Sequence, residues 1–405
     1  MPAHSSSARP RANAVVGQSG GPTAAINSSL AGVVQTALER PEIGRVYGML
    51  GAIKGLLDGR LVDLGQESPE TIEGLRQTPS SALGSGRHKL GPNDYDRLAD
   101  ALRRFDIRYV YYIGGNDSAD TTNQIASLAA SIGHEMYVVG VPKTVDNDLV
   151  ETDHCPGFGS AARYVALAMQ EAGLDSEAIA SYPVKVIEVM GRHAGWLAAA
   201  GALARRAPGQ APHLVYVPER PLDLDRVFED ASRVVREHGH CVISLAEGAR
   251  GPDGKYLTDS SASQLDAFGH QQMAGAGDVL AHVIEANTKI RARCDRPGTL
   301  QRASLALASR TDLAEAYEVG RAAVTASMEG KTGVMVTLVR LGDDPYACET
   351  GLAPVGRIAN REKRLPAEYI NEAGNYPTEA FTRYARPLIG DPLPDYVRLA
   401  KVPVS

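Results

Sequence analysis

Short apolar runs, each followed at once by a glycine-rich or polar turn and then by a helical pattern, recur along this chain and constrain its fold more than any other feature. In the first copy, Ala14–Gly17 leads through QSGGPTA into a helix that we expect to end near Glu39. Further apolar runs of this kind lie at 109–113, 136–140, 184–189, 213–217, 240–245 and 333–339. Such alternation is typical of parallel sheets flanked by helices, with ligands bound beyond the carboxyl ends of the strands.

The length of 405 residues is more than one domain of about 150 residues needs, so we expect two lobes. A polar, turn-rich passage at 147–156, followed by a long predicted helix from about Phe158 to Ala180, marks the division between them. The pattern therefore predicts an α/β protein with two Rossmann-like three-layer lobes, mainly parallel sheets and an active site in the cleft between the lobes. The expected parts are a disordered tail at 1–12, a first lobe at 13–150, a second lobe at 151–340, and a segment at 341–405 that wraps back over the first lobe.

Charge and cysteine usage exclude several classes of protein. The 42 basic and 48 acidic residues leave a net charge of −6, which disfavours bulk binding to nucleic acid. The four cysteines are far apart and include no CxxC pair, so they indicate neither a disulfide framework nor a zinc cage, and they fit a reducing compartment. No stretch approaches the roughly 18 apolar residues of a membrane span, and the polar start lacks the apolar core of a signal peptide. We expect a cytoplasmic protein that binds neither nucleic acid nor membrane.

Two glycine turns place backbone N–H groups where a phosphate could bind. Gly20 and Gly21 lie between the first predicted strand and its helix, and their spacing is not the GxGxxG of a dinucleotide site. Taken alone, this segment fits a simple strand-to-helix turn equally well. The second turn, 114–118, puts Asn116 and Asp117 at a helix start, where they serve either as an N-cap or as oxygen ligands of a metal–phosphate assembly.

The heptad 142–148 combines acids and a cation directly after a predicted strand. Asp146 and Asp148 are two residues apart, so in an extended loop both carboxylates can face one side, one as a base and the other toward a metal or neighbouring donors. Lys143 adds a positive charge three residues before Asp146. A surface turn is the alternative, but the combination favours a catalytic loop.

Other charged residues follow later strands. Arg192 offers a forked donor for phosphate or sugar hydroxyls, whereas His193 beside it is more typical of a packed or capping histidine. Glu247 ends another strand and can accept hydrogen bonds from a sugar. Further cations lie in clusters beside glycine or proline, and each alone is also typical of a solvated surface: Arg87, Lys89, Arg293 and Arg302.

Together, the segments GGPTAAIN, GGNDS, PKTVDND, MGRHAGW, AEG and LQR have the order and spacing of the phosphofructokinase family over about residues 13–310. The chain resembles the pyrophosphate-dependent branch of that family. The resemblance implies a phosphoryl donor on the first lobe, a sugar phosphate mostly on the second, Mg²⁺ between them, and a homodimer or homotetramer. It implies reversible phosphoryl transfer from pyrophosphate to the C1 hydroxyl of D-fructose 6-phosphate, giving fructose 1,6-bisphosphate and phosphate.

The resemblance also assigns roles to individual residues. Asp146 matches the base for the C1 hydroxyl, with Lys143 and Asp117 beside it as further catalytic residues. Residues expected at the sugar phosphate are Thr144, Asp146, Met190, Gly191, Arg192, Glu247, Arg302 and Arg293, the last reaching across a subunit interface. Residues expected at the donor are Gly20, Gly21, Arg87, Lys89, Gly115 and Ser118, and those expected at the metal are Asn116 and Asp148.

Departures from the ATP-dependent pattern bear on the donor. Asp117 and Lys143 each replace a glycine, and in the resembled branch these replacements mark the use of pyrophosphate. Thr299 replaces a histidine near the sugar phosphate, and Pro183 replaces an interface arginine whose part Lys185 could take. The alternatives are an ATP-dependent phosphofructokinase, distinguished by those two replacements, and a non-catalytic sugar-phosphate-sensing subunit, disfavoured by the retained Asp146 and Asp148.

Overall fold

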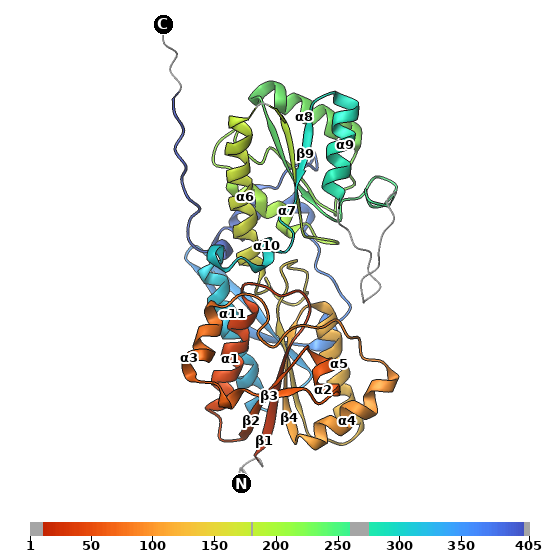
Figure 1. The fold of residues 1–405 in the computed structure, drawn as a ribbon, viewed down its shortest axis with the longest axis vertical. Coiled ribbons are helices and arrows are strands. Elements are labelled where there is room, and N and C mark those ends of the chain that lie inside the picture. Colours follow the sequence, from red (N-terminus) through yellow and green to blue (C-terminus); the bar gives the residue numbers. More distant parts are fainter. Residues whose placement is uncertain (1–10, 180, 260–274, 401–405) are drawn as a thin grey trace.

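The protein forms two α/β lobes, each built around its own sheet (Figure 1). This is a computed structural model, and it describes residues 11–179, 181–259 and 275–400. The first sheet has the strand order β11-β10-β5-β4-β1-β2-β3 and the second has the order β7-β8-β6-β9. All neighbouring strands run parallel except the pairs β2–β3 and β10–β11, which confirms the predicted fold class. No helix within the described ranges is long and apolar enough to cross a membrane.

The first lobe contains β1 (Ala12–Gln18), β2 (Ile43–Met49), β3 (Leu61–Asp63), β4 (Ile107–Gly114), β5 (Tyr137–Pro142), β10 (Val334–Asp343) and β11 (Tyr346–Pro354). Its helices are α1 (Ile26–Leu38), α2 (Ile53–Leu57), α3 (Pro69–Gly74), α4 (Tyr95–Arg104), α5 (Asn116–Ser131), α11 (Arg310–Met328) and α12 (Val355–Ile358). The second lobe contains β6 (Val184–Val189), β7 (Leu214–Tyr216), β8 (Cys241–Ala246) and β9 (Ala292–Asp295). Its helices are α6 (Phe158–Ala178), α7 (Trp196–Ala200), α8 (Leu224–His238), α9 (Ala276–Thr288), α10 (Leu300–Ala303) and α13 (Glu379–Ala385).

Strand burial explains which strands the sequence predicts. The central strands β4, β5, β6 and β8 are buried along almost their whole length, because helices cover both faces of a parallel sheet, and such strands read as continuous apolar runs. The edge or near-edge strands β2, β3, β9 and β11 contain partly buried or exposed positions and carry charged residues, so they give no such run. β1 begins at the buried Ala12, one residue before the predicted start of the lobe.

The chain returns to the first lobe earlier than the predicted boundary at residue 340. Helix α11 packs along α1, as Figure 1 shows, and β10 pairs with β5 at Val334↔Val139. The two helices approach so closely that a Cβ on Gly32 would lie 2.2 Å from the Tyr317 carbonyl oxygen, and one on Gly320 2.2 Å from that of Ser29. Residues 310–354 therefore belong with the first lobe. Glycine contacts between distant helices leave no apolar run, which is why the sequence did not reveal this return.

We expected residues 341–405 to wrap back over the first lobe. In the structure this segment divides between the two lobes. Strand β11 joins the first sheet, but Leu365, Phe381 and Leu388 lie in the buried core of the second lobe. Phe381 and Tyr384 pack around Trp196 with ring centroids 6.5 and 5.3 Å away. Burial of these aromatic side chains holds the segment on the second lobe.

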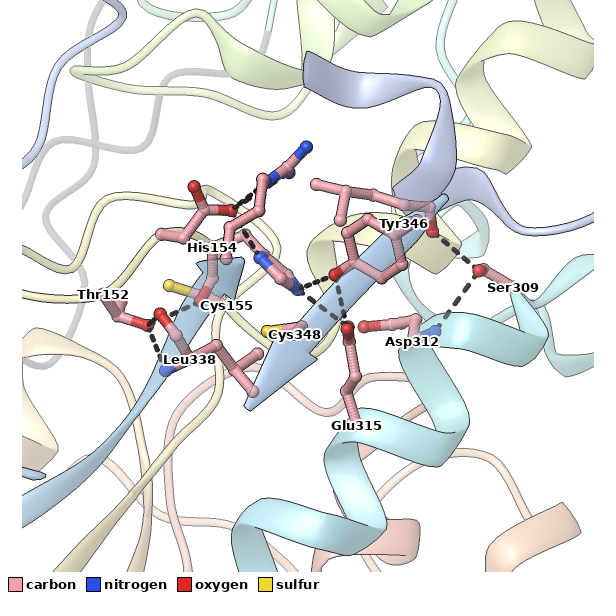
Figure 2. Close-up of polar contacts among 12 residues, drawn as sticks. Thr152, His154, Cys155, Ser309, Asp312, Glu315, Leu338, Tyr346 and Cys348 are labelled. Carbon is pink, nitrogen blue, oxygen red and sulfur yellow. Dashed lines mark hydrogen bonds and ion pairs between the residues drawn. The ribbon is translucent and has the colours of Figure 1, made fainter. Parts of the chain in front are cut away.

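The loop 143–157 between β5 and α6 is held by buried charged side chains (Figure 2). His154, 1% exposed, bonds Asp153 through Nδ1 at 2.8 Å and Glu315 of α11 through Nε2 at 2.7 Å. The Tyr346 hydroxyl donates to the other oxygen of Glu315 at 2.5 Å, and Arg340 pairs with Asp153 at 3.0 Å. Because a ring that serves two carboxylates donates from both nitrogens, His154 is an imidazolium. Burial alone lowers its pKa, but the bonds to Asp153 and Glu315 outweigh that effect, and the pKa is raised.

This cluster acts as an ion-pair network rather than as a metal site. Ligand-type atoms of His154, Glu315 and Cys348 lie within 4.8 Å of one another. Both ring nitrogens of His154 are already bonded to carboxylates, however, and burial raises the pKa of Cys348 to about 11, so its thiol stays protonated. The network therefore joins the loop to α11 and β11.

Asp312 gives α11 a second attachment, at the end of the loop. Its carboxylate accepts from the Gly157 N–H at 2.7 Å, the Ser160 N–H at 3.1 Å and the Ser160 hydroxyl at 2.5 Å. Gly157 has φ +105°, a conformation that favours glycine. Burial raises the pKa of Asp312 to about 6. One helix of the first lobe thus holds both the loop and the start of α6.

We predict that His154→Gln lowers the free energy of unfolding mainly below about pH 6.5, the pKa of an unfolded histidine. A raised folded pKa contributes stability that is complete below the unfolded pKa and is lost as pH rises through the folded pKa. At pH 6 the loss should be about 2–4 kcal/mol, because one partner of a largely buried ion pair is removed. Chemical unfolding at pH 6 and pH 9 measures it. His88→Gln, which removes a more exposed His–Asp pair, is the control and should change little. An equal loss at both pH values would contradict a charged His154.

Candidate active site

A cavity of about 640 Å³ lies between the lobes, at the carboxyl ends of β1, β4 and β5 on one side and of β6 and β8 on the other. The lining residues are Ser19, Gly20, Gly21, Arg87, Gly115, Asn116, Asp117, Ser118, Lys143, Thr144, Asp146, Asp148, Arg192, His193, Ala194, Glu247, Asn360, Glu362 and Arg364. Most of the residues expected at a site therefore lie around one cavity. The carboxyl ends of parallel strands meet at one edge of a sheet, and here two such edges face each other.

Lys143 is bound directly to the first glycine turn. Although only 3% exposed, it donates from Nζ to the carbonyl oxygens of Ser19 at 2.8 Å and Gly21 at 3.0 Å. Gly20 has φ +78°, and a Cβ there would lie 3.2 Å from this Nζ. Burial and then the charge of Arg302 lower the pKa of Lys143 to about 8, against the opposing charges of Asp146 and Asp148. At pH 7 this side chain is still mostly a cation, fixed at the wall of the cavity.

Five carboxyl groups line the cavity, those of Asp117, Asp146, Asp148, Glu247 and Glu362, and burial shifts the pKa of three of them. Burial raises the pKa of Asp146, with Arg192 and Lys143 acting in the opposite direction. The pKa values of Asp148 and Glu247 are each raised to about 7. Burial is the larger cause for both, and the nearby charge of Asp146 adds to it. A carboxyl group with a pKa near neutrality can both take up and release a proton under working conditions.

Asp148 has an unsatisfied oxygen. Its Oδ1 is buried and has no hydrogen-bond partner among the described residues. A buried carboxylate oxygen without a partner is costly, and a bound cation would satisfy it. This atom is thus the best candidate metal ligand in the cavity.

Two tight turns bring Arg192 and Glu247 to the second-lobe wall. Gly191 has φ +136°, and a Cβ on Gly248 would lie 1.8 Å from the Arg192 carbonyl oxygen, so the turns after β6 and β8 touch. The Glu247 N–H donates to the Val189 oxygen at 2.9 Å, which fixes the second turn. The buried Nε of Arg192 has no hydrogen-bond partner among the described residues, so it is available to a ligand oxygen.

Five of the expected site residues do not line the cavity. Met190 and Gly191 form the backbone behind Arg192, and Met190 N–H donates to the Gln301 side chain at 3.0 Å. Arg302 lies against the first glycine turn, where a Cβ on Gly21 would be 2.7 Å from its guanidinium. The exposed Lys89 lies outside the lining set.

Arg293 lies at the edge strand β9, away from the cavity. It pairs with Asp175 at 3.2 Å and with Asp295 at 3.6 Å and is 39% exposed at the side chain. Lys185 does not take the place of the replaced arginine, because it is 2% exposed and its Nζ is bound to Asp175 at 2.5 Å.

Residues 360–364, which we call the strap, were not predicted from the sequence as part of the site. In the first lobe the Asn116 amide holds its first two residues, donating to the Arg361 carbonyl oxygen and accepting from the Asn360 N–H at 2.7 Å. In the second lobe Glu362 accepts from His193 Nδ1 at 2.6 Å. Asn116 is thus engaged by the strap, and its expected role as a metal ligand stays a prediction. The charged sequence NREKR reads as a solvated loop, so only its distant contacts reveal it.

The strap also contacts the loop that carries Asp146. The Lys363 N–H donates to the backbone carbonyl oxygen of Asp148 at 2.6 Å, and the Lys363 Nζ donates to the backbone carbonyl oxygens of Thr152 and Asp153. The Trp196 indole donates to the Lys363 oxygen at 3.2 Å. Both lobes and the loop are therefore joined by one short segment.

Comparison with known proteins agrees with this architecture. The profile of the family described as phosphofructokinase matches residues 13–327. The chain is 43% identical to pyrophosphate–fructose 6-phosphate 1-phosphotransferase of Methylococcus capsulatus, over 97% of each chain. It is 44% identical to the protein of that name from Halomonas elongata, over 95% of this chain and 93% of the relative. The crystal structure of pyrophosphate-dependent phosphofructokinase from Nitrosospira multiformis superposes with a TM-score of 0.86 at 39% identity, covering 97% of this chain and 98% of the other. The chain therefore belongs to the phosphofructokinase family.

Proposed function

We propose that this enzyme transfers a phosphoryl group reversibly between pyrophosphate and the C1 hydroxyl of D-fructose 6-phosphate, forming fructose 1,6-bisphosphate and phosphate. The observation that carries the proposal is Lys143, buried on the first glycine turn and sharing one cavity with Asp146. Relatives of 43% and 44% identity over nearly the full chain carry the name of this activity.

Phosphoryl transfer needs positioning and charge stabilisation more than covalent catalysis, and the cavity supplies both. The glycine turn, Arg87 and Lys143 form a positively charged wall for the donor. Arg192 and Glu247 on the opposite wall bind the sugar phosphate and its hydroxyls. Asp146 accepts the proton of the attacking C1 hydroxyl, and its raised pKa allows it to return that proton in the reverse reaction.

We propose that Asp148 holds Mg²⁺. Its hard oxygen donors, and above all the unpartnered Oδ1, fit this cation, and Asp146 remains the base. When bound, Mg²⁺ neutralises phosphate charge during transfer. We also propose a homodimer or homotetramer, in which the outward Arg293 would reach a neighbouring subunit.

The two alternatives explain fewer features. An ATP-dependent enzyme would have to accommodate the Asp117 carboxylate beside a longer, more highly charged donor. A non-catalytic sensor has no use for the partly buried Asp146 and Asp148, whose removal from water costs stability.

Asp146→Asn should lower kcat by about 10²–10⁴-fold, because the amide keeps the shape of the side chain but cannot accept the proton. The KM for fructose 6-phosphate should change little. A coupled assay with pyrophosphate measures both, and Asp100→Asn, an exposed substitution on α4, is the matched control. A variant that keeps more than about a tenth of the rate would refute the assignment of the base.

Arg192→Ala should raise the KM for fructose 6-phosphate by about tenfold or more, because it removes charged hydrogen bonds made in both the ground and transition states. Arg302→Ala should raise it less, since Arg302 lies against the glycine turn and is not among the residues that line the cavity. Arg296→Ala, whose guanidinium pairs with Asp278 outside the cavity, serves as the control. Steady-state kinetics at saturating pyrophosphate decides; an unchanged KM in both variants would place the sugar elsewhere.

Wild-type enzyme offered each donor in parallel should prefer pyrophosphate. Asp117→Gly should permit weak use of ATP and lower the pyrophosphate rate, because it removes a carboxylate beside the donor phosphates. Adding Lys143→Gly should depress the pyrophosphate reaction further, because it removes the buried cation. A wild-type preference for ATP, or an Asp117→Gly variant with unaltered kcat/KM for both donors, contradicts the role of these two residues.

A further inference from the structure

The strap lies beside the first turn of α5, on the side of the cavity where we place the donor. Gly115 to Ser118 form the start of this 16-residue helix and line the cavity. Helix starts after a glycine turn are the usual place for phosphates in α/β proteins. Any group attached to the outer donor phosphate must therefore leave the cavity past this turn or past its neighbours, and the strap is one of those neighbours.

Direct bonds hold the strap against this turn. Asn116, the first residue of α5, binds the strap backbone twice, and Asn360 Nδ2 donates to Asp120 Oδ1 at 3.0 Å, one helical turn further on. Asn360 has φ +60°, a left-handed conformation in which asparagine is among the tolerated residues. The outer side of the first turn of α5 is thus covered by backbone.

The strap is equally fixed on the second lobe. Besides the Glu362–His193 pair and the Trp196 bond, the Leu365 N–H donates to Glu219 at 2.8 Å. Movement of the strap away from the cavity would break contacts in both lobes at once. The Glu362 carboxylate also lines the cavity and adds negative charge close to Asp148, whose pKa it helps to raise.

We infer that the strap is a second determinant of donor choice: it closes the donor end of the cavity by occupying space beside α5, so that a diphosphate is accepted and the remainder of a nucleotide is not. The inference rests on the proposed function but names different residues from Asp117 and Lys143. Asp117 opposes a nucleotide by charge, whereas the strap opposes it chiefly by bulk. Pyrophosphate and ATP share the same terminal phosphoryl group, so an enzyme can distinguish them by excluding the rest of the nucleotide.

The test adds Asn360→Gly and Glu362→Ala to the Asp117→Gly enzyme. Glycine keeps the left-handed backbone of residue 360 but removes the bond to Asp120, and alanine removes the bond to His193. We expect kcat/KM for ATP to rise by at least about tenfold over Asp117→Gly alone. Calorimetric titration with ATP, without the sugar, should show tighter binding by a similar factor. The matched control is Lys289→Gly in the same background, which also converts a left-handed residue, φ +62°, at the distant end of α9, and should leave both values unchanged.

The outcomes separate this inference from the proposed function. If wild-type enzyme does not use pyrophosphate, the proposed function fails. If it does, and the strap substitutions leave ATP affinity and kcat/KM within about twofold of Asp117→Gly alone, the strap has no part in donor choice and the inference is overturned. If thermal melting shows that the triple variant is unfolded, the double variant Asp117→Gly, Asn360→Gly is used instead. This variant keeps the bond from the backbone N–H of residue 360 to Asn116. An unchanged ATP affinity in that variant overturns the inference equally.

Discussion

The charged contacts between α11 and the loop 143–157 are the interaction on which the site depends. That loop carries Lys143, Asp146 and Asp148 but contains no regular helix or strand, so its shape comes from side-chain bonds. His154 joins it to Glu315, and Asp312 closes its far end. Because α11 packs on α1 of the first sheet, the loop is held to the same framework as the glycine turn that Lys143 contacts. The donor wall and the proposed base are therefore positioned by one set of packed helices.

The same arrangement explains why the cavity contains groups that are costly to bury. Asp146, Asp148 and Glu247 lie close together in a site where burial raises each pKa, and Lys143 loses most of its contact with water. Such groups reduce stability unless cations and fixed dipoles compensate them. In exchange, the site is organised before the substrates arrive, which is the main source of rate in phosphoryl transfer. Asp148 Oδ1 and Arg192 Nε have no partner among the described residues, and a bound ligand would supply one for each.

Charge and space act together at the donor end of this cavity. Asp117 is exposed at the start of α5, and the strap covers the side of the same turn. Substitutions at Asp117 alone would leave the backbone of the strap in place. In our proposal, donor choice therefore also depends on a segment far along the chain, since Asn360 lies 244 residues after Asn116.

Local pattern in the sequence was enough to predict the alternation of strands and helices, the two-lobed α/β class and most of the cavity wall. The reason is geometric: buried parallel strands read as apolar runs, and residues directly after them must gather at the carboxyl edge of the sheet. Gly21, Asp117, Asp146, Arg192 and Glu247 were predicted in this way, and all five line the cavity. Only the tertiary structure decided the return of α11 and β10 to the first lobe, the engagement of Asn116 by the strap and the raised carboxyl pKa values. Each of these depends on contacts between residues far apart in the chain, or on burial from water by several elements at once, and neither leaves a periodic signal in the sequence.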